Sequence, residues 1–157
     1  MEAFDLRDEA LPAFDNDAAL THPRVARMNA AIREADGVIL AVPVYNWALG
    51  SAAKSLVEAT GATDDTRRAP WFDKVVTFLV AGGLPHAYTA HLSLANSLAL
   101  DFKCVVNPYH VYASERDFPA RGEPNAHVLE RLDRTLSVAV ELARLLRGRG
   151  YRSGWEI

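Results

Sequence analysis

The fold of this chain follows from one stretch of its sequence, Asp36-Gly37-Val38-Ile39-Leu40-Ala41-Val42-Pro43-Val44-Tyr45-Asn46-Trp47. Its apolar run, 38–42, is typical of a strand buried on both faces, as in a parallel sheet. Proline cannot donate to a neighbouring strand, so we expect the strand to end at Pro43. Ligands of open α/β sheets bind at this carboxyl edge, and the turn that follows offers aromatic faces and an amide to a planar ligand. The alternative is a strand-to-helix turn whose rings only pack.

Apolar runs alternate with helical patterns along the rest of the chain. We predict strands over residues 2–6, 38–42, 75–81 and 102–106, and helices over 21–35, 51–59, 86–100 and 125–147. Residues 109–124 are predicted to form a loop. Strands that alternate with helices over short connections indicate βαβ units with right-handed crossovers. The pattern therefore predicts an α/β fold with a doubly wound parallel sheet.

Composition and charge exclude several functional classes. Of the 157 residues, 50% are hydrophobic, which suits a single globular domain spanning 1–157. The net charge of −3 gives no basic footprint for nucleic acid, and no apolar run is long enough to span a membrane. The N-terminus has no signal-peptide pattern, so we expect a cytoplasmic protein. The one cysteine, Cys104, lies in an apolar run and is interpreted as a small core residue.

Two successive predicted strands end in loops of unusual composition. One loop covers 43–50, and the other covers 81–86 and contains Gly82 and Gly83. If the strands are parallel neighbours, both loops lie side by side at one edge of the sheet. Glycine has no side chain, so the backbone there can approach a flat ligand closely and offer N–H donors. The simpler interpretation is a turn that needs glycine for its own geometry.

The residues around the first loop resemble the signature of a known family. Pro43, Tyr45 and Asn46, followed by Lys54 and Glu58, are similar to the P-x-Y-N-x(7)-K-x(3)-[DE] pattern of the NADPH-dependent FMN reductases, which are flavodoxin-like flavoproteins. Further resemblance covers the family's second, fourth and fifth strands, at 4–12, 75–83 and 101–108. It implies a flavodoxin-like doubly wound parallel sheet. Because the resemblance begins at the family's second strand, we expect the first strand, the first helix and the phosphate-binding loop to be missing. We also expect that the start site was assigned too late, so that Met1 is an internal residue of the natural protein.

The same resemblance implies a cofactor, partners and a site. The cofactor would be FMN, the electron donor NAD(P)H, and the acceptor a small molecule such as free flavin or a quinone. Two loops would hold the flavin ring, through Pro43, Val44, Tyr45, Asn46, Trp47, Gly82 and Gly83. The flavin carries the chemistry in such enzymes, so no catalytic side chain is assigned. The family also implies a homodimer, with the aromatic segments 71–72 and 109–118 as candidate interface regions; ordinary packing is the alternative.

Other kinds of site find little support in the sequence. Lys54 and Glu58 lie four residues apart on a predicted helix and are interpreted as a structural ion pair. His86 is expected to be solvated, and its spacing from His91 does not suit a zinc site. The serines lack the context of a hydrolase nucleophile. The rival to a reductase is a flavin-free flavodoxin-like binding or assembly module, or an inactive truncated remnant, and the colour of the purified protein distinguishes them.

Overall fold

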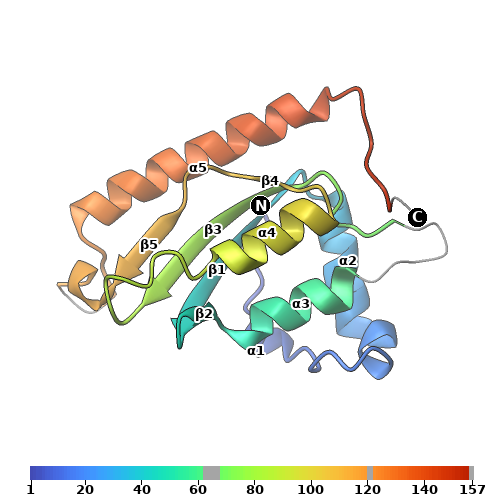
Figure 1. Ribbon diagram of the computed structural model, residues 1–157, viewed down its shortest axis with the longest axis horizontal. Helices are drawn as coiled ribbons and strands as arrows, with labels where there is room; N and C mark the ends of the chain where they lie inside the picture. Colours follow the sequence, from blue (N-terminus) through green and yellow to red (C-terminus); the bar gives the residue numbers. More distant parts are fainter. Residues whose placement is uncertain (62–67, 120–121, 156–157) are drawn as a thin grey trace.

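The computed structural model describes residues 1–61, 68–119 and 122–155, which form a sheet with helices on both faces (Figure 1). The strands are β1 (Gly37–Tyr45), β2 (Ala48–Leu49), β3 (Val75–Gly82), β4 (Val105–Val106) and β5 (Val111–Ser114). Central β3 pairs in parallel with β1 on one side and with β4 and β5 on the other. The short β2 is antiparallel to β1. The predicted parallel α/β sheet is therefore confirmed.

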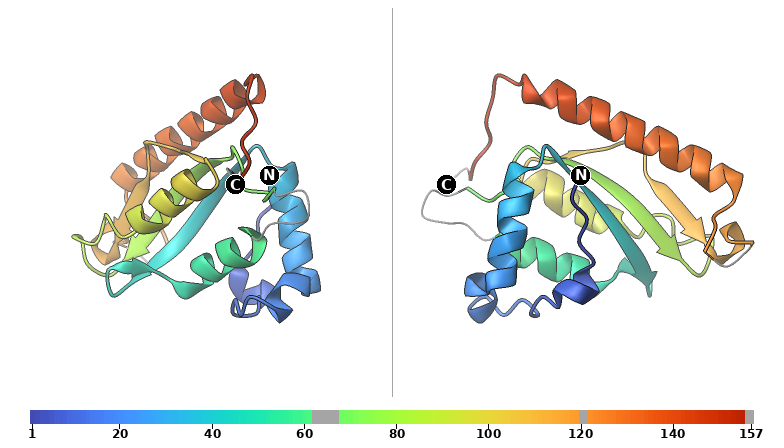
Figure 2. Two further views of the ribbon diagram at one scale, coloured as in Figure 1. Left: turned by 45° about the vertical axis from the view of Figure 1, so that its right-hand side comes forward. Right: turned by 180° about the vertical axis from the view of Figure 1, so that it is seen from behind.

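Helices cover the two faces of this sheet unequally. They are α1 (Leu6–Glu9), α2 (Pro23–Glu34), α3 (Ser51–Gly61), α4 (Leu92–Asp101) and α5 (Ala126–Arg147), with the 3₁₀ turns η1 (Ala18–Thr21) and η2 (Glu115–Asp117). The long α5 runs along one face, while α3 and α4 lie on the other, as the views in Figures 1 and 2 show. This is the doubly wound arrangement that the sequence predicts.

The alternation of side chains along the strands divides the core in two. Leu40 and Phe78 point to one face, where they join the large apolar cluster that includes Leu98 of α4. Leu79 belongs to a smaller cluster on the other face, which contains Val128 of α5. Because β3 is buried on both faces, its sequence is a continuous apolar run rather than an alternating one.

The N-terminal prediction of a strand over 2–6 is wrong. Residues 1–5 form no regular element, and α1 begins at Leu6. The reason is a local cap, since the carboxylate of Asp5 accepts a hydrogen bond from the Arg7 backbone amide at 2.8 Å. Phe4 still packs partly buried against the main cluster. The segment therefore contributes apolar contacts but no strand.

Two further predicted elements differ from the structure in their bounds. The predicted strand 102–106 shortens to β4, because α4 continues to Asp101 and Lys103 adopts a φ of 55°. The predicted loop 109–124 contains β5, which extends the parallel ladder on β3. The helix predicted over 86–100 begins only at Leu92. The C-terminal helix agrees with its prediction over 125–147, because the side chain of Asn125 caps its first turn and its last residue precedes Gly148.

Strand β1 continues two residues beyond the proline that we expected to end it. Pro43 pairs with Ala81 of β3, and its carbonyl oxygen accepts a hydrogen bond from the Gly50 amide at 3.0 Å. Proline is tolerated here because β1 has only one long neighbour and borders β2 only at Val44 and Tyr45. Among the described residues, no other strand pairs with this outer edge.

Candidate functional site

The structure brings the two predicted loops together at one edge of the sheet. The parallel register pairs Pro43 with Ala81, so β1 and β3 end side by side. Across the gap between the loops, the rings of Trp47 and His86 lie 5.2 Å apart, centre to centre, with their planes tilted by 34°. In an open α/β sheet the carboxyl edge is where ligands bind. The expected juxtaposition of the loops is therefore present.

The first loop is a two-residue hairpin turn between β1 and β2. Both of its central residues have positive φ, 49° at Asn46 and 65° at Trp47, as a type I′ turn requires. Asparagine adopts this conformation readily, but a bulky residue such as tryptophan does so at a cost of about 1–3 kcal/mol. Glycine would avoid that cost. The turn itself thus gives no reason for a tryptophan, and an indole ring at this edge suits a ligand-binding role.

The aromatic side chains of this turn are open to solvent. Tyr45 is 65% exposed and Trp47 is 60% exposed, although both are large and apolar. The neighbouring Val44 is half-buried and packs against the main cluster, which anchors the turn to the core. Exposed aromatic rings grouped beside a backbone loop are typical of sites for planar ligands.

The two glycines of the second loop differ in their surroundings. A Cβ atom at Gly82 would overlap the hydroxyl of Tyr112 and lie 3.2 Å from its Cζ, whereas a Cβ at Gly83 would meet nothing within 4 Å. Gly82 is therefore needed for packing against Tyr112. The surface at Gly83 is open, so only this glycine leaves room that a flat ligand could occupy.

Tyr112 supports the second loop, whereas its place in the sequence indicates only packing, a substrate mouth or a subunit interface. It lies on β5, and its hydroxyl donates a hydrogen bond to the carbonyl oxygen of Leu84. On the same strand Ser114 pairs with Gly82, so a third strand end reaches this edge. The alternation in Val111-Tyr112-Ala113 is the sequence feature that indicates a strand here, but the charged residues that follow it favour a loop.

Ser114 is held in place by the residues that follow it. The carboxylate of Asp117 accepts hydrogen bonds from the Ser114 amide at 2.8 Å and from its hydroxyl at 2.9 Å. The first of these bonds is the main reason why the pKa of Asp117 lies below its usual range. Asp117 also accepts a hydrogen bond from the side chain of Asn125, which caps α5. This network serves the fold, since it ties the end of β5 to the start of α5.

The chemistry of the two loops fits a flavin ring. The amides of Asn46, Trp47, Gly83 and Leu84 make no backbone hydrogen bond to any described residue. They are unpaired donors beside exposed aromatic faces, and an isoalloxazine ring presents nitrogen and oxygen acceptors along its edge. Unpaired N–H groups of this kind require either water or a ligand. Pro43, Tyr45, Trp47 and the glycine loop therefore match the shape and polarity of such a ring without any charged side chain.

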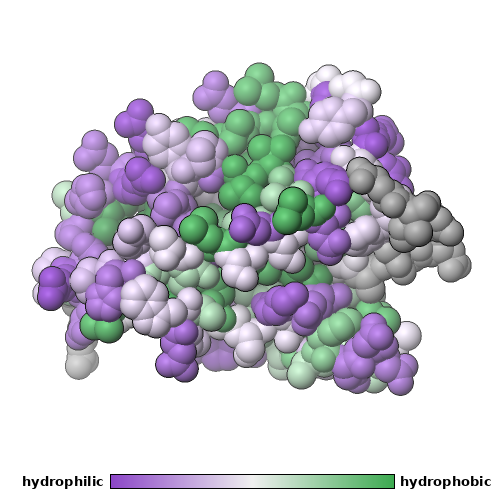
Figure 3. Space-filling view, in the orientation of Figure 1, coloured by the Kyte–Doolittle hydropathy of each residue, from purple (hydrophilic) through white to green (hydrophobic). Residues whose placement is uncertain are grey.

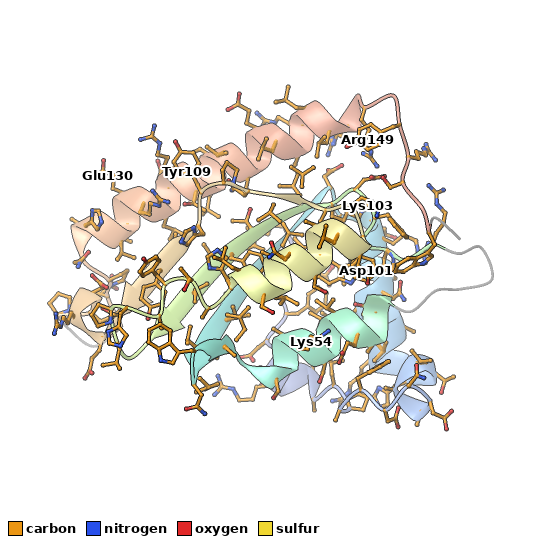
Figure 4. The ribbon with its side chains drawn as sticks, in the orientation of Figure 1. Lys54, Asp101, Lys103, Tyr109, Glu130 and Arg149 are labelled. Atoms are coloured by element: carbon orange, nitrogen blue, oxygen red, sulfur yellow. The ribbon has the colours of Figure 1, made fainter. Side chains whose placement is uncertain are left out.

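Side chains outside the two loops have structural roles. Lys54 and Glu58 of α3 form an ion pair of 3.0 Å, as predicted, and Figure 4 shows Lys54 on α3. The thiol of Cys104 is buried and donates to the carbonyl oxygen of Trp71 at 3.2 Å. Its burial raises the pKa of Cys104 to about 12, as suits an inert core residue.

His86, His91 and His110 each pack against another aromatic ring. His86 contacts Trp47, whereas His91 is 4% exposed and its ring lies 4.3 Å from the ring of His110. Burial lowers the pKa of both His91 and His110, so both are neutral near pH 7. Within the described part of the chain, no three His, Cys, Asp or Glu side chains come together as a metal site needs.

Comparison with known proteins identifies the family. The sequence profile described as "NADPH-dependent FMN reductase" matches residues 1–118. The chain belongs to this family. The match covers β1, β3 and the strand ends that carry both loops, and it ends at Phe118, before α5.

Solved structures support the same fold. RosB, solved with a bound intermediate named 8-demethyl-8-formylriboflavin-5′-phosphate, has a TM-score of 0.67 and 22% identity over 96% of this chain. The flavoenzyme NAD(P)H:(acceptor) oxidoreductase FerB from Paracoccus denitrificans has a TM-score of 0.66 and 18% identity over 93%. A WrbA-like flavodoxin from Agrobacterium tumefaciens has a TM-score of 0.55 and 20% identity over 75%.

These likenesses concern the fold, which is flavodoxin-like. The chain spans 62% of the length of the RosB chain, 80% of that of FerB and 70% of that of the flavodoxin. Among the described helices, none combines the length and the apolar composition that crossing a membrane requires.

Proposed function

We propose that this protein is an NAD(P)H-dependent oxidoreductase that uses FMN. The observation that carries the proposal is the pairing of two loops at the carboxyl edge of β1 and β3, with exposed rings at Tyr45 and Trp47 and an open glycine at Gly83. Membership of the FMN reductase family supports it. So does RosB, whose bound compound is a riboflavin phosphate derivative.

The residues of the site bind and orient, and none of them needs to transfer a proton. The faces of Tyr45 and Trp47 on the hairpin would lie against the flavin ring, and the amides of the two loops would donate hydrogen bonds to its polar edge. Gly83 allows the backbone to approach that ring closely. A bound flavin supplies the redox chemistry, which is hydride acceptance from a nicotinamide and delivery of electrons to an acceptor. The proposed acceptor is a small molecule such as free flavin or a quinone, and the proposed location is cytoplasmic.

We also propose a homodimer, with an interface that differs from one of the expected regions. Trp71 is 0% exposed and its Nε1 donates to Thr60 Oγ1 at 2.8 Å, so the segment 71–72 belongs to the core. Exposed apolar side chains occur instead on α4 and α5, at Leu100 and Leu145. Figure 3 shows apolar surface gathered over α5 and toward α4. A light-scattering mass equal to one chain at micromolar concentration contradicts this dimer.

The decisive experiment is reduction of the bound cofactor. The purified chain is incubated with FMN, freed of excess by gel filtration, and mixed with NADH or NADPH without oxygen. We expect a yellow protein whose blue absorbance is bleached by at least one nicotinamide. Tyr45→Ala should retain less FMN, whereas Tyr151→Ala, which removes an exposed ring from the C-terminal tail, should retain as much as wild type. A colourless wild-type protein would instead support the flavin-free binding module.

A further inference from the structure

Strand β1 has an unpaired outer side over residues 37–43, called the open edge below. Its inner side pairs with β3 from Gly37 to Pro43, and its outer side meets only the short β2, at Val44 and Tyr45. Figure 2 shows β1 at the margin of the sheet, while α5 packs on β3 and β5. Among the described residues, no strand adds to the open edge.

Two hydrogen bonds show which backbone groups of β1 point outward. The Val75 amide of β3 donates to the carbonyl oxygen of Asp36 at 3.4 Å, so the even-numbered residues of β1 face β3. The Gly50 amide donates to the carbonyl oxygen of Pro43 at 3.0 Å, so the odd-numbered residues face outward. The N–H and C=O groups of one strand residue lie on the same side and alternate along the strand. The outward residues of the open edge before Pro43 are therefore Gly37, Ile39 and Ala41.

These outward backbone groups are available to a partner. The amides and carbonyl oxygens of Gly37, Ile39 and Ala41 make no hydrogen bond to any described residue. They are spaced two residues apart, at about 6.6 Å, which is the repeat that a neighbouring strand matches. Backbone groups on such an edge bond either to water or to another strand.

The face of the sheet beside the open edge is apolar and bare. Ile39 pairs in register with Thr77, and the Asn107 side chain donates both to the Thr77 hydroxyl and to a carbonyl oxygen of α5. Ile39 therefore lies on the face that carries α5. It is 40% exposed, Ala41 beside it is exposed, and Val140 of α5 is 50% exposed. A strand added here would place alternate side chains beside these apolar groups.

The charge of the open edge defines the chemistry of its partner. Residues 37–47 contain no charged side chain, and their one proline, Pro43, lies at the end of the open edge. Strand edges that remain unpaired are usually protected by lysine, proline or a covering helix. A charged partner side chain beside Ile39 would lose its water without gaining an opposite charge. The open edge therefore suits an uncharged segment.

The size of the open edge favours a short segment over a second copy of this chain. Seven paired residues, 37–43, span roughly 23 Å, and the thickness of a sheet with its side chains is about 10 Å. Such a contact buries roughly 500 Å² on both partners together, whereas specific interfaces between folded proteins bury at least about 1,000 Å². Beyond residue 43 the position of a neighbouring strand is filled by β2. A longer strand cannot continue there.

We propose that the open edge binds a short, extended and uncharged peptide segment of another protein, which adds a strand to the sheet. Main-chain hydrogen bonds to Gly37, Ile39 and Ala41 supply the affinity, and alternate apolar side chains beside Ile39 and Val140 supply the specificity. The proposal is independent of the flavin site, because it uses neither the hairpin turn nor the glycine loop.

The test is fluorescence anisotropy of a labelled peptide, Thr-Val-Thr-Val-Thr-Val-Thr, titrated with the full chain. Two further peptides carry N-methyl groups on all valine amides or on all threonine amides. Only alternate amides of an added strand face its neighbour. We therefore expect one methylated peptide to bind at least tenfold more weakly than the other.

A pair of chain variants locates the binding. Ile39→Lys places a charge beside the open edge and should weaken binding of the unmethylated peptide at least tenfold. The matched control is Leu100→Lys on α4, where the side chain is 76% exposed, and it should bind the peptide as wild type does. Thermal melting shows whether each variant is folded. If Ile39→Lys unfolds, the two methylated peptides still decide the question on wild type.

Four results would overturn the proposal. They are no saturable binding of the unmethylated peptide to wild type, equal affinities of the two methylated peptides, and equal affinities of folded Ile39→Lys and Leu100→Lys. The fourth is a light-scattering mass that falls from two chains to one in Ile39→Lys alone, which would show that a second copy occupies the open edge. FMN binding measured in the same samples separates failure of this proposal from failure of the flavin site.

Discussion

Replacement of Gly82 by alanine should destabilise the protein, whereas the same change at Gly83 should not. The added methyl group at position 82 would overlap the Tyr112 hydroxyl, and its neighbours belong to the packed β3–β5 ladder. Such overpacking costs about 1–3 kcal/mol. Loss of glycine from the unfolded chain returns about 0.4–1 kcal/mol. The net loss in the free energy of unfolding at Gly82→Ala is therefore at most about 2.6 kcal/mol, with a central value of about 1.3 kcal/mol. At Gly83 only the stabilising loss of unfolded-chain entropy remains, because no atom lies within 4 Å of the added Cβ.

Urea unfolding followed by circular dichroism measures both variants, and Tyr112→Phe completes a double-mutant cycle. Tyr112→Phe alone removes a hydrogen bond to Leu84, at a cost of about 0.5–1.5 kcal/mol. In that background Gly82→Ala should cost less, because the overlapping oxygen is gone. We expect a coupling energy of at least about 0.5 kcal/mol. Equal stability of Gly82→Ala and Gly83→Ala, or strictly additive effects in the cycle, would refute the reasoning.

Three further predictions concern the core. Trp71→Phe leaves the buried Thr60 hydroxyl without its indole donor and creates a cavity, so it should lower stability by about 2–4 kcal/mol in urea unfolding. Burial lowers the pKa of His91 in the folded state, so its contribution to stability is complete above about pH 6.5 and declines as the pH falls through the folded pKa. His91→Gln should therefore flatten the dependence of the free energy of unfolding on pH below about 6.5. An unchanged slope in the variant would contradict this prediction. Because Cys104 is buried, a thiol reagent should modify it only in urea, and rapid labelling of the native protein would contradict the burial.

The strands that carry the site could be predicted because each is a continuous apolar run bounded by turn residues. The runs at 38–42 and 75–81 have no competing helical period, and parallel neighbours necessarily end at the same edge. The N-terminal segment 2–6 was predicted wrongly, because five residues of mixed character are compatible with several structures. The side chain of Asp5 caps a helix and so favours helix over strand. Over five residues, the sequence pattern alone does not show whether such a cap forms or a strand does.

The geometry of the site depends on contacts that sequence patterns do not specify. Two neighbouring positive φ values at Asn46 and Trp47 define the turn, yet Asn-Trp is not the Asn-Gly pair that usually indicates such a hairpin. The difference between Gly82 and Gly83 arises from Tyr112, which lies 30 residues further along the chain from Gly82.

The most direct test of the account is a titration of FMN into wild type, Gly83→Val and Trp47→Gly, followed by quenching of flavin fluorescence. Gly83 has open surroundings and glycine relieves the positive φ at position 47, so both variants should melt at or above the wild-type temperature. The account predicts saturable binding of FMN to wild type and at least about tenfold weaker binding to each variant, a loss of roughly 1.4 kcal/mol. Affinities equal to that of wild type in both folded variants would contradict the claim that these two loops hold the flavin.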